Sequence, residues 1–227
     1  MQDEFDGRSL TDRLLHWGRR ASDRVGTAAR ESAGQAMPTK AFGKFLACLA
    51  SRESPVLLDL GPVVGPNVGV LGERLGCKLV VEDLFADLDR HAKEGRIPEF
   101  AEFLSARLKH PDGSVDGILC WDLLDYLDKS SAKVLGRELT RMLKPGGALL
   151  GFFATTPPED RRASYTKFLI VDDTTLEHRS YPAARAKQPV LNNRDITRLF
   201  EGLRVAESFL LLTKTREILL RKAGGAG

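Results

Sequence analysis

The stretch VLLDLGPVVGPNVGVLGERL, residues 56–75, decides the fold of this chain. An apolar run ends in an acid, Asp59, and leads through a glycine-rich turn into a helical pattern, as in a buried parallel strand followed by a helix. Pro66 stands at the first helical position, where its missing N–H costs least. Backbone amides in such a turn can approach a ligand closely, so the stretch predicts a nucleotide-cofactor site.

The spacing of the glycines narrows the choice of ligand. Glycines stand at positions 61, 65 and 69, so the G-x-G-x-x-G fingerprint of dinucleotide sites is not met. The carboxylate of Asp59 at the strand end would repel a pyrophosphate, but it suits a ligand that carries an ammonium and a sulfonium group. This charge pattern is that of S-adenosylmethionine.

The same stretch resembles the first motif of the class I S-adenosylmethionine-dependent methyltransferases, in which an acid and a glycine-containing turn follow a buried strand. Asp59, Gly61 and Gly65 match the motif, whereas Val63 stands where the family usually has a middle glycine. The resemblance implies that Asp59, Gly61 and Gly65 bind S-adenosylmethionine. We expect Val63 to be tolerated, because a β-branched residue in extended backbone can point away from the ligand.

A second acidic strand end follows the helix. The segment KLVVEDLF, residues 78–85, is an apolar strand that ends in Glu82 and Asp83, and an acid at this place in the fold class binds the ribose hydroxyls. Either acid fits the usual interval of roughly 20 residues from Asp59, so both are candidates for cofactor binding. The alternative is a capping pair for the next helix, a role that suits Asp83 by residue type.

Two later segments complete the resemblance. PDGSVDGILCWDLLDYLD, residues 111–128, predicts a turn and a buried strand with Trp121 and Asp122 at its carboxyl end. In the family this corner touches the methionyl end of the cofactor and the substrate; the alternatives are a core aromatic for Trp121 and a helix cap for Asp122. LTRMLKPGGALLGFFAT, residues 139–155, predicts a helix that ends at Lys144, a Pro-Gly-Gly turn and the fifth strand.

The remaining segments depart from the family or extend it. Its third strand has no clear counterpart, because PEFAEFLSARL, residues 98–108, has apolar residues at helical spacing. Residues 157–190 predict an inserted hairpin, which is followed by a helix with Asn192 or Asn193 as its cap and by two antiparallel strands. Candidates from the insert to line the acceptor site are Tyr165, Lys167, Arg179, Tyr181 and Arg185.

The first 50 residues look mostly helical and include a basic amphipathic segment, residues 13–31. Such a helix can lie on a membrane or a partner, and the alternative is a lid or packing helix of the kind that covers the cofactor in similar methyltransferases. We divide the chain into an N-terminal helical extension, residues 1–52, a methyltransferase-like domain, residues 53–222, and a disordered tail, residues 223–227.

Composition fits a single soluble globular domain. With 227 residues, 42% of them apolar, the chain is long enough for one core, and a net charge of +3 is too small to favour nucleic acid or an anionic membrane. Three widely separated cysteines without C-x-x-C spacing indicate neither a disulfide framework nor a zinc site. None of the four histidines is predicted to bind a metal, and His110 is expected in a surface turn. No signal peptide or membrane-length apolar run is found, so we expect a cytoplasmic protein without a membrane span.

The sequence therefore predicts an α/β Rossmann-like doubly wound domain with a mostly parallel sheet, an N-terminal helical extension and a C-terminal antiparallel strand pair. The leading function is methyl transfer from S-adenosylmethionine to a small-molecule acceptor. Positioning supplies much of the rate in such a reaction, so no catalytic residue is named. No Asn-Pro-Pro-aromatic motif is found, which disfavours a nucleobase acceptor.

Two rival classes of function remain. One is a non-catalytic binding or scaffolding protein that keeps the fold with a degenerate cofactor site, for which Val63 and the missing third strand are the best support. The other is a different nucleotide-binding enzyme on the same fold, because a fold does not determine a function. The sequence leaves the acceptor and the oligomeric state open.

Overall fold

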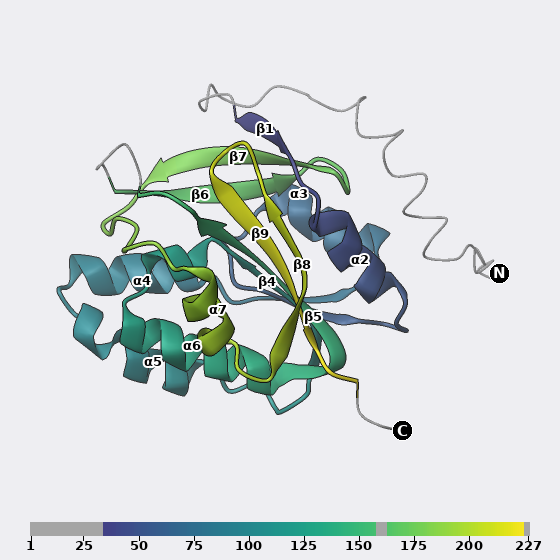
Figure 1. Ribbon diagram of the computed structural model, residues 1–227, viewed down its shortest axis with the longest axis horizontal. Coiled ribbons are helices and arrows are strands. Elements are labelled where there is room, and N and C mark those ends of the chain that lie inside the picture. The colour runs from purple at the N-terminus through teal and green to yellow at the C-terminus, as the bar shows by residue number, and fades with distance from the viewer. Residues whose placement is uncertain (1–33, 158–162, 225–227) are drawn as a thin grey trace, which may run out of the picture.

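A six-stranded sheet forms the centre of the computed structural model, which describes residues 34–157 and 163–224 (Figure 1). Its strands are β2 (Val56–Asp59), β3 (Lys78–Val81), β4 (Val115–Trp121), β5 (Leu143–Ala154), β8 (Leu203–Leu210) and β9 (Thr215–Lys222). The strand order is β3-β2-β4-β5-β9-β8. The first four of these run parallel, and β9 pairs antiparallel with β5 and β8. The predicted mostly parallel sheet and C-terminal antiparallel pair are confirmed.

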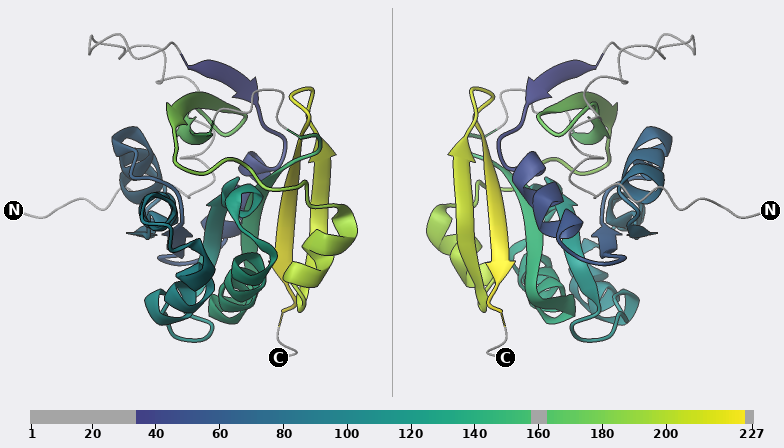
Figure 2. Two further views of the ribbon diagram at one scale, coloured as in Figure 1. Left: turned by 90° about the vertical axis from the view of Figure 1, so that its left-hand side faces the viewer. Right: turned by 90° about the vertical axis from the view of Figure 1, so that its right-hand side faces the viewer.

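Helices cover both faces of this sheet, so the domain has three layers (Figures 1 and 2). One face carries α2 (Phe42–Ala50), α3 (Gly65–Val68) and the π-helix η2 (Gly69–Arg74). The other face carries α4 (Leu84–Lys93), η3 (Ile97–Glu99), α5 (Phe100–Arg107), α6 (Lys129–Met142) and α7 (Asn193–Leu199). A short 3-10 helix, η4 (Leu123–Tyr126), leads from β4 to α6. The doubly wound architecture is therefore confirmed.

The helix α5 takes the place of a third parallel strand in the chain order. Phe100 and Leu104 lie one helical turn apart on α5, and both are buried in the core on that face. Between β3 and β4 the structure holds helices and no strand. The helical spacing of this segment predicted the outcome, and β3 consequently becomes an edge strand of the sheet.

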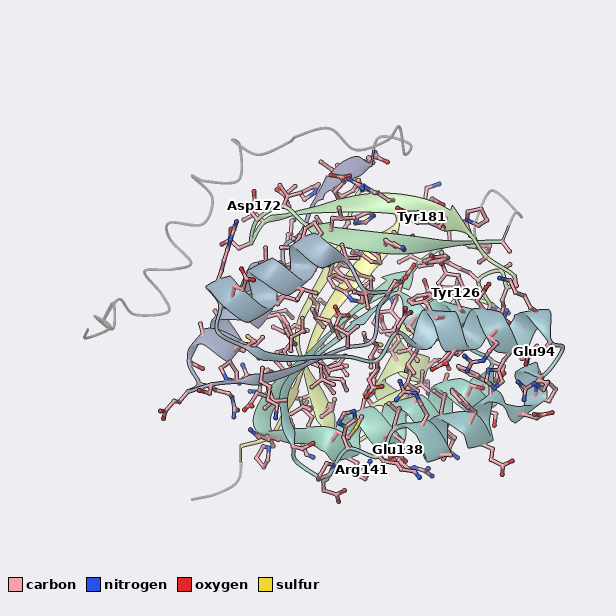
Figure 3. The ribbon with its side chains drawn as sticks, turned by 180° about the vertical axis from the view of Figure 1, so that it is seen from behind. Glu94, Tyr126, Glu138, Arg141, Asp172 and Tyr181 are labelled. Carbon is pink, nitrogen blue, oxygen red and sulfur yellow. The ribbon has the colours of Figure 1, made fainter. Side chains whose placement is uncertain are left out.

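A second, three-stranded sheet lies beside the carboxyl ends of the parallel strands (Figure 1). The strands β6 (Ser164–Ile170) and β7 (Thr175–Pro182) form the predicted hairpin, and β1 (Gln35–Pro38) pairs antiparallel with β7. The tip of the hairpin carries Asp172 (Figure 3).

The first 50 residues were expected to be mostly helical, and within them Gln35–Pro38 form a strand that was not predicted. These residues lie along the edge of β7, which supplies hydrogen-bond partners that no local sequence pattern can reveal. The helix α2 follows, with Phe42 and Phe45 buried against the sheet. The basic segment of residues 13–31 lies outside the described residues.

The Pro-Gly-Gly segment interrupts a strand instead of joining a helix to one. The helix α6 ends at Met142, before the predicted Lys144, and strand pairing begins at the next residue. The register of β5 against β4 shifts across this segment, so the chain bulges there. Gly146 has a φ of 71°, which glycine adopts without steric cost.

The last helix begins as the sequence predicted. Asn192 is the N-cap of α7 and forms a capping box with Asp195. Across residues 34–157 and 163–224, no helix has the length and apolar character that a membrane crossing requires.

The contact between α6 and α7 allows a stability test. A Cβ added at Gly136 would stand 2.2 Å from the carbonyl oxygen of Leu199, a backbone atom that cannot move aside cheaply. Alanine exceeds glycine in helix propensity by about 1 kcal/mol, but overpacking costs about 1–3 kcal/mol. We therefore expect Gly136→Ala to lower the free energy of unfolding, measured by urea denaturation.

The matched control is Gly72→Ala on η2, where an added Cβ meets no atom within 4 Å. This variant should be as stable as the wild-type protein or slightly more stable. If the two variants unfolded at the same urea concentration, the result would contradict the close packing of α6 against α7 at Gly136.

Candidate functional site

The predicted cofactor-binding residues lie along the carboxyl ends of β2, β3 and β4. Asp59 and Trp121 are the last residues of β2 and β4, and Glu82 directly follows β3. The backbone N–H of Glu82 donates to the carbonyl oxygen of Asp59 at 2.8 Å, which aligns two of these strand ends. The other predicted residues follow the same strands: Gly61, Gly65, Asp83 and Asp122. Open α/β sheets bind their ligands at this edge.

Asp59 is a buried carboxylate held by two donors. Its Oδ1 accepts hydrogen bonds from the backbone N–H of Gly61 at 2.9 Å and from Nε1 of Trp121 at 2.6 Å. Burial raises the pKa of Asp59 to about 6, although both hydrogen bonds oppose the shift. With this pKa, the protonation state of the carboxyl group is sensitive to the charge of a neighbouring group.

The indole of Trp121 lies directly against Gly61. A Cβ added at Gly61 would stand 2.6 Å from Cδ1 and 2.7 Å from Nε1 of this ring, so only glycine fits at position 61. Trp121 itself has a φ of 49°, a left-handed conformation that is strained for a bulky residue. The strain coincides with a register shift between Leu119 and Trp121 in the pairing of β4 with β5, and such bulges redirect side chains.

Two phenylalanines stack on the indole. The ring centroid of Phe168, on β6, lies 5.0 Å from that of Trp121 with the planes 8° apart, and Phe152, on β5, lies 6.1 Å away. His178, opposite Phe168 on β7, packs edge-on against the Phe168 ring. The hairpin is thus joined to the central sheet through an aromatic cluster of Trp121, Phe152 and Phe168.

Asn67 on α3 fixes the same hairpin from the side of the glycine turn. Its side-chain amide donates to the carbonyl oxygen of Phe168 at 2.7 Å and accepts from the N–H of Ile170 at 2.8 Å. Because β6 is the outer strand of its sheet, Asn67 takes the place of a neighbouring strand. The side chain is buried, so both hydrogen bonds lie away from water.

The glycine-rich turn has an open side and a covered side. Gly65 begins α3, and an added Cβ there would meet no atom within 4 Å. Val64 is extended, and Val63 is 60% exposed. The exposure of Val63 is compatible with the expectation that its side chain can point away from a ligand, whereas Gly61 is covered by Trp121.

The two acids after β3 have different surroundings. Glu82 is buried and forms ion pairs with Arg107 and with Nε2 of His110. His110, expected in a surface turn, is thus half-buried and directed to an internal carboxylate. These partners direct Glu82 toward α5 and away from the glycine turn.

Asp83 is directed toward the glycine turn and caps a helix. It has a φ of 36°, and its Oδ1 accepts from the N–H of Ala86 at the start of α4, as the capping alternative expected. Burial raises the pKa of Asp83, while the backbone N–H of Val63 and the ammonium of Lys167 act in the opposite direction. Asp83 therefore lies between the turn and the hairpin.

Asp122 belongs to a buried charged group at the end of β4. Nζ of Lys187 lies 2.9 Å from Oδ2 of Asp122 and 3.0 Å from Oδ2 of Asp125. Burial lowers the pKa of Lys187, but the two carboxylates outweigh burial and the net direction is upward. Oδ1 of Asp122 is buried without a hydrogen-bond partner among the described residues, and its side chain makes no capping hydrogen bond.

The candidate acceptor residues fall into two groups. The rings of Tyr165 and Tyr181 stack at 5.6 Å, and Nζ of Lys167 lies 4.5 Å from the Tyr181 centroid. These three share the hairpin near Asp83, and Figure 3 shows Tyr181 on the hairpin beyond Tyr126. The remaining two have other contacts: Arg179 pairs with Glu177, and Arg185 donates to the carbonyl oxygen of Tyr126.

The residues of this site that were not predicted from the sequence include Asn67, Phe168 and Lys187. Asn67 stands in a helical turn, Phe168 in an ordinary strand pattern, and Lys187 in an irregular segment. Their roles come from contacts with residues far away in the chain, so no local motif could have identified them.

Residues 58–151 match the model of the family described as Methyltransferase domain. This region of the chain is similar to that family. The matched region holds the strand ends that carry Asp59, Glu82 and Trp121, and it ends before the hairpin of β6 and β7. No curated protein matches the sequence.

Solved structures of similar fold include three methyltransferases. One, from Burkholderia thailandensis, is 1,6-didemethyltoxoflavin-N1-methyltransferase with bound 1,6-didemethyltoxoflavin and S-adenosylhomocysteine; it is 14% identical, with 94% of this chain and 87% of that chain covered and a TM-score of 0.46. A S-adenosylmethionine-dependent methyltransferase from Clostridium acetobutylicum is 14% identical, with 81% and 92% covered and a TM-score of 0.46. One from Aquifex aeolicus is 16% identical, with 78% and 87% covered and a TM-score of 0.44. Similarities of this size carry no information about ligands.

The buried carboxyl group of Asp59 predicts a pH dependence of stability. Its pKa rises from 3.8 to about 6 on folding, so the native state retains this proton between about pH 4 and pH 6 while the unfolded chain releases it. The free energy of unfolding should fall across this window by up to about 3 kcal/mol, and the loss should persist at higher pH.

Asp59→Asn isolates this effect, because the amide keeps the Oδ1 acceptor for Gly61 and Trp121 but cannot ionise. In urea denaturation the variant should be more stable than the wild-type protein near pH 7.5, and the difference should shrink below about pH 5. A difference that stayed constant with pH would show that Asp59 does not titrate in this way.

Proposed function

We propose that this chain transfers a methyl group from S-adenosylmethionine to a small-molecule acceptor. One observation carries the proposal: within the region that matches the methyltransferase family, the turn from Asp59 to Gly65 and the side chain of Asp83 meet at the carboxyl edge of a parallel sheet. An acid at each of two neighbouring strand ends suits a ligand that carries positive charge at one end and ribose hydroxyls at the other.

The acidic side chains at the strand ends suit S-adenosylmethionine, but the space over Gly61 is too small for this ligand in the present conformation. Asp59, Asp83 and Asp122 supply acceptors for an ammonium group and for hydroxyl groups. The open side of Gly65 allows close approach of a ligand to the backbone. The indole of Trp121 covers Gly61, however, so a ligand reaches that part of the turn only after the ring moves.

In the proposed reaction, bound S-adenosylmethionine supplies a methyl group activated by the positive charge on sulfur. Asp83 would hold the ribose hydroxyls, the turn from Gly61 to Gly65 would hold the methionyl part, and Asp122 would lie at the corner shared with the acceptor. The hairpin excludes water from that corner. Aligning the acceptor with the methyl group supplies most of the rate, so we assign no side chain as a general base.

The hairpin gives the acceptor side an aromatic and cationic lining. Tyr165, Lys167 and Tyr181 share one strand pair next to Asp83, and the ammonium of Lys167 lies over the Tyr181 ring. A planar acceptor of small size would stack on such rings. We therefore include these three residues in the proposed acceptor site.

A non-catalytic binding protein with a closed cofactor site is the second candidate. The indole of Trp121 favours it, because the ring fills the space over Gly61 and occupies Asp59 by a hydrogen bond. Binding of S-adenosylhomocysteine, the product form of the cofactor, separates the two candidates.

Calorimetric titration tests the leading function. We expect S-adenosylhomocysteine to bind with a dissociation constant of about 1 μM or lower, which corresponds to about 8 kcal/mol and is readily measured. NAD and ATP, titrated in parallel, should not bind comparably, because two acids at the strand ends repel their phosphates. Stronger binding of either nucleotide would favour a different enzyme on this fold.

The two acids after β3 provide a matched pair of variants. Asp83→Asn keeps a capping oxygen and tolerates a positive φ, but it removes the charge proposed to bind ribose. Hydrogen bonds to charged groups are worth about 1.5–3 kcal/mol, so S-adenosylhomocysteine affinity should fall about tenfold or more.

Glu82→Gln should behave in the opposite way. It weakens the ion pairs with Arg107 and His110, so urea denaturation should show lower stability while calorimetry shows nearly unchanged affinity. If Glu82→Gln lost affinity for S-adenosylhomocysteine and Asp83→Asn kept it, Glu82 and not Asp83 would be the acid that binds the ribose.

A further inference from the structure

Trp121 already makes the contacts that the glycine turn offers to a ligand. Its ring lies where a Cβ on Gly61 would be, and its Nε1 donates to Oδ1 of Asp59. The ring is 3% exposed, and its hydrogen bond to Asp59 is buried. The covered side of the turn is therefore closed by the side chain of the protein itself.

We propose that Trp121 and Phe168 form a plug that closes the cofactor crevice, and that S-adenosylmethionine binds after the hairpin carries Phe168 away and the indole leaves Gly61. This inference rests on the proposed function, because it assumes that the turn binds this cofactor. It adds that the crevice has a closed and an open state, and that the hairpin sets their balance.

The backbone at Trp121 is strained in the closed state, so a change of conformation there would relieve the strain. Its φ of 49° places a bulky residue in the left-handed region, and strain of this kind persists only while the surroundings enforce it. The surroundings in question are the stacked rings of Phe168 and Phe152 and the carboxylate of Asp59. Removal of Phe168 takes away one of these three constraints and leaves the strain in place.

Asn67 acts as the latch of the plug. Its amide holds the two outward-facing backbone groups of β6 on either side of Leu169, namely the carbonyl oxygen of Phe168 and the N–H of Ile170. The same residue stands on α3, the helix that begins at the glycine turn. A single side chain therefore couples the position of the hairpin to the turn that it covers.

Opening also changes the surroundings of Asp59. In the closed state the carboxyl group is buried with Asp83 nearby, and no cation among residues 34–157 and 163–224 shifts its pKa. An open crevice lets water or the cationic part of a ligand reach this carboxylate, and both stabilise its ionised form. A positively charged ligand therefore favours the open state.

Intrinsic fluorescence reports on the plug directly. The chain has two tryptophans, so a Trp17→Phe background leaves Trp121 as the single emitter. Titration of this protein with S-adenosylhomocysteine should shift the Trp121 emission to longer wavelength and raise its quenching by acrylamide, because the ring leaves its buried stack.

Two variants loosen the plug at different points. Phe168→Leu keeps apolar volume on β6 but removes the stacked ring, and Asn67→Ala removes the latch. Each should bind S-adenosylhomocysteine about tenfold more tightly than the parent, because the apparent dissociation constant is divided by the open fraction. Urea denaturation confirms that each variant is folded, and either variant alone suffices for the test.

Leu212→Ala is the control, since this apolar residue is fully exposed and lies in the turn between β8 and β9, outside the proposed site. Its affinity should equal that of the parent. Unchanged affinity in both loosened variants, together with unchanged Trp121 emission on binding, would overturn the plug and leave the proposed function intact. Absence of binding at millimolar ligand in the parent and in both variants would overturn the proposed function, and with it the plug.

Discussion

The hydrogen bond from Nε1 of Trp121 to the carboxylate of Asp59 joins the ends of two parallel strands and constrains everything around them. To direct its indole there, β4 bulges and Trp121 takes a left-handed backbone. Residue 61 must then be glycine, because the ring occupies the place of a side chain. The indole ring is covered by the apolar ring of Phe168, which lies on a hairpin further along the sequence. The hairpin in turn needs a partner for its outer edge, and Asn67 supplies one.

The acids of this edge show why a parallel sheet concentrates charge at a ligand site. Strand ends bring Asp59, Glu82 and Asp122 together, and each burial would be costly without compensation. Glu82 is compensated by Arg107 of α5, and Asp122 by Lys187. Within the described part of the chain no cation is paired with Asp59, and its pKa is raised by burial. Asp83 stays half-buried between the turn and the hairpin, which makes it the acid best placed to exchange its contacts for those of a ligand.

The sequence predicted what local patterns encode. The strand ends, the helix in place of a third strand and the cap at Asn192 all follow from periodicity and residue type over short segments. The strand Gln35–Pro38 was not predicted, because pairing with a distant strand decides its conformation. The same limit explains why the cover of the site was not predicted. Phe168 contacts Trp121 and Lys187 contacts Asp122 only because of how the hairpin and the segment after it fold back onto the sheet. The local sequence does not determine that arrangement.

If Trp121 closes the cofactor site as proposed, an active methyltransferase and a degenerate binding protein differ only in the fraction of molecules that are open. Apparent affinity falls in proportion to the fraction of molecules that are open, and each 1.4 kcal/mol of opening free energy lowers that fraction about tenfold. If opening costs about 1 kcal/mol, a micromolar site stays nearly micromolar; if it costs about 4 kcal/mol, the same residues give a site close to millimolar. The stacking of Trp121 on Phe168 and the latch at Asn67 resist opening, while backbone strain at Trp121 and the buried charge of Asp59 promote it. A few substitutions in the hairpin would therefore move such a protein between the two functions without altering the residues proposed to bind the cofactor.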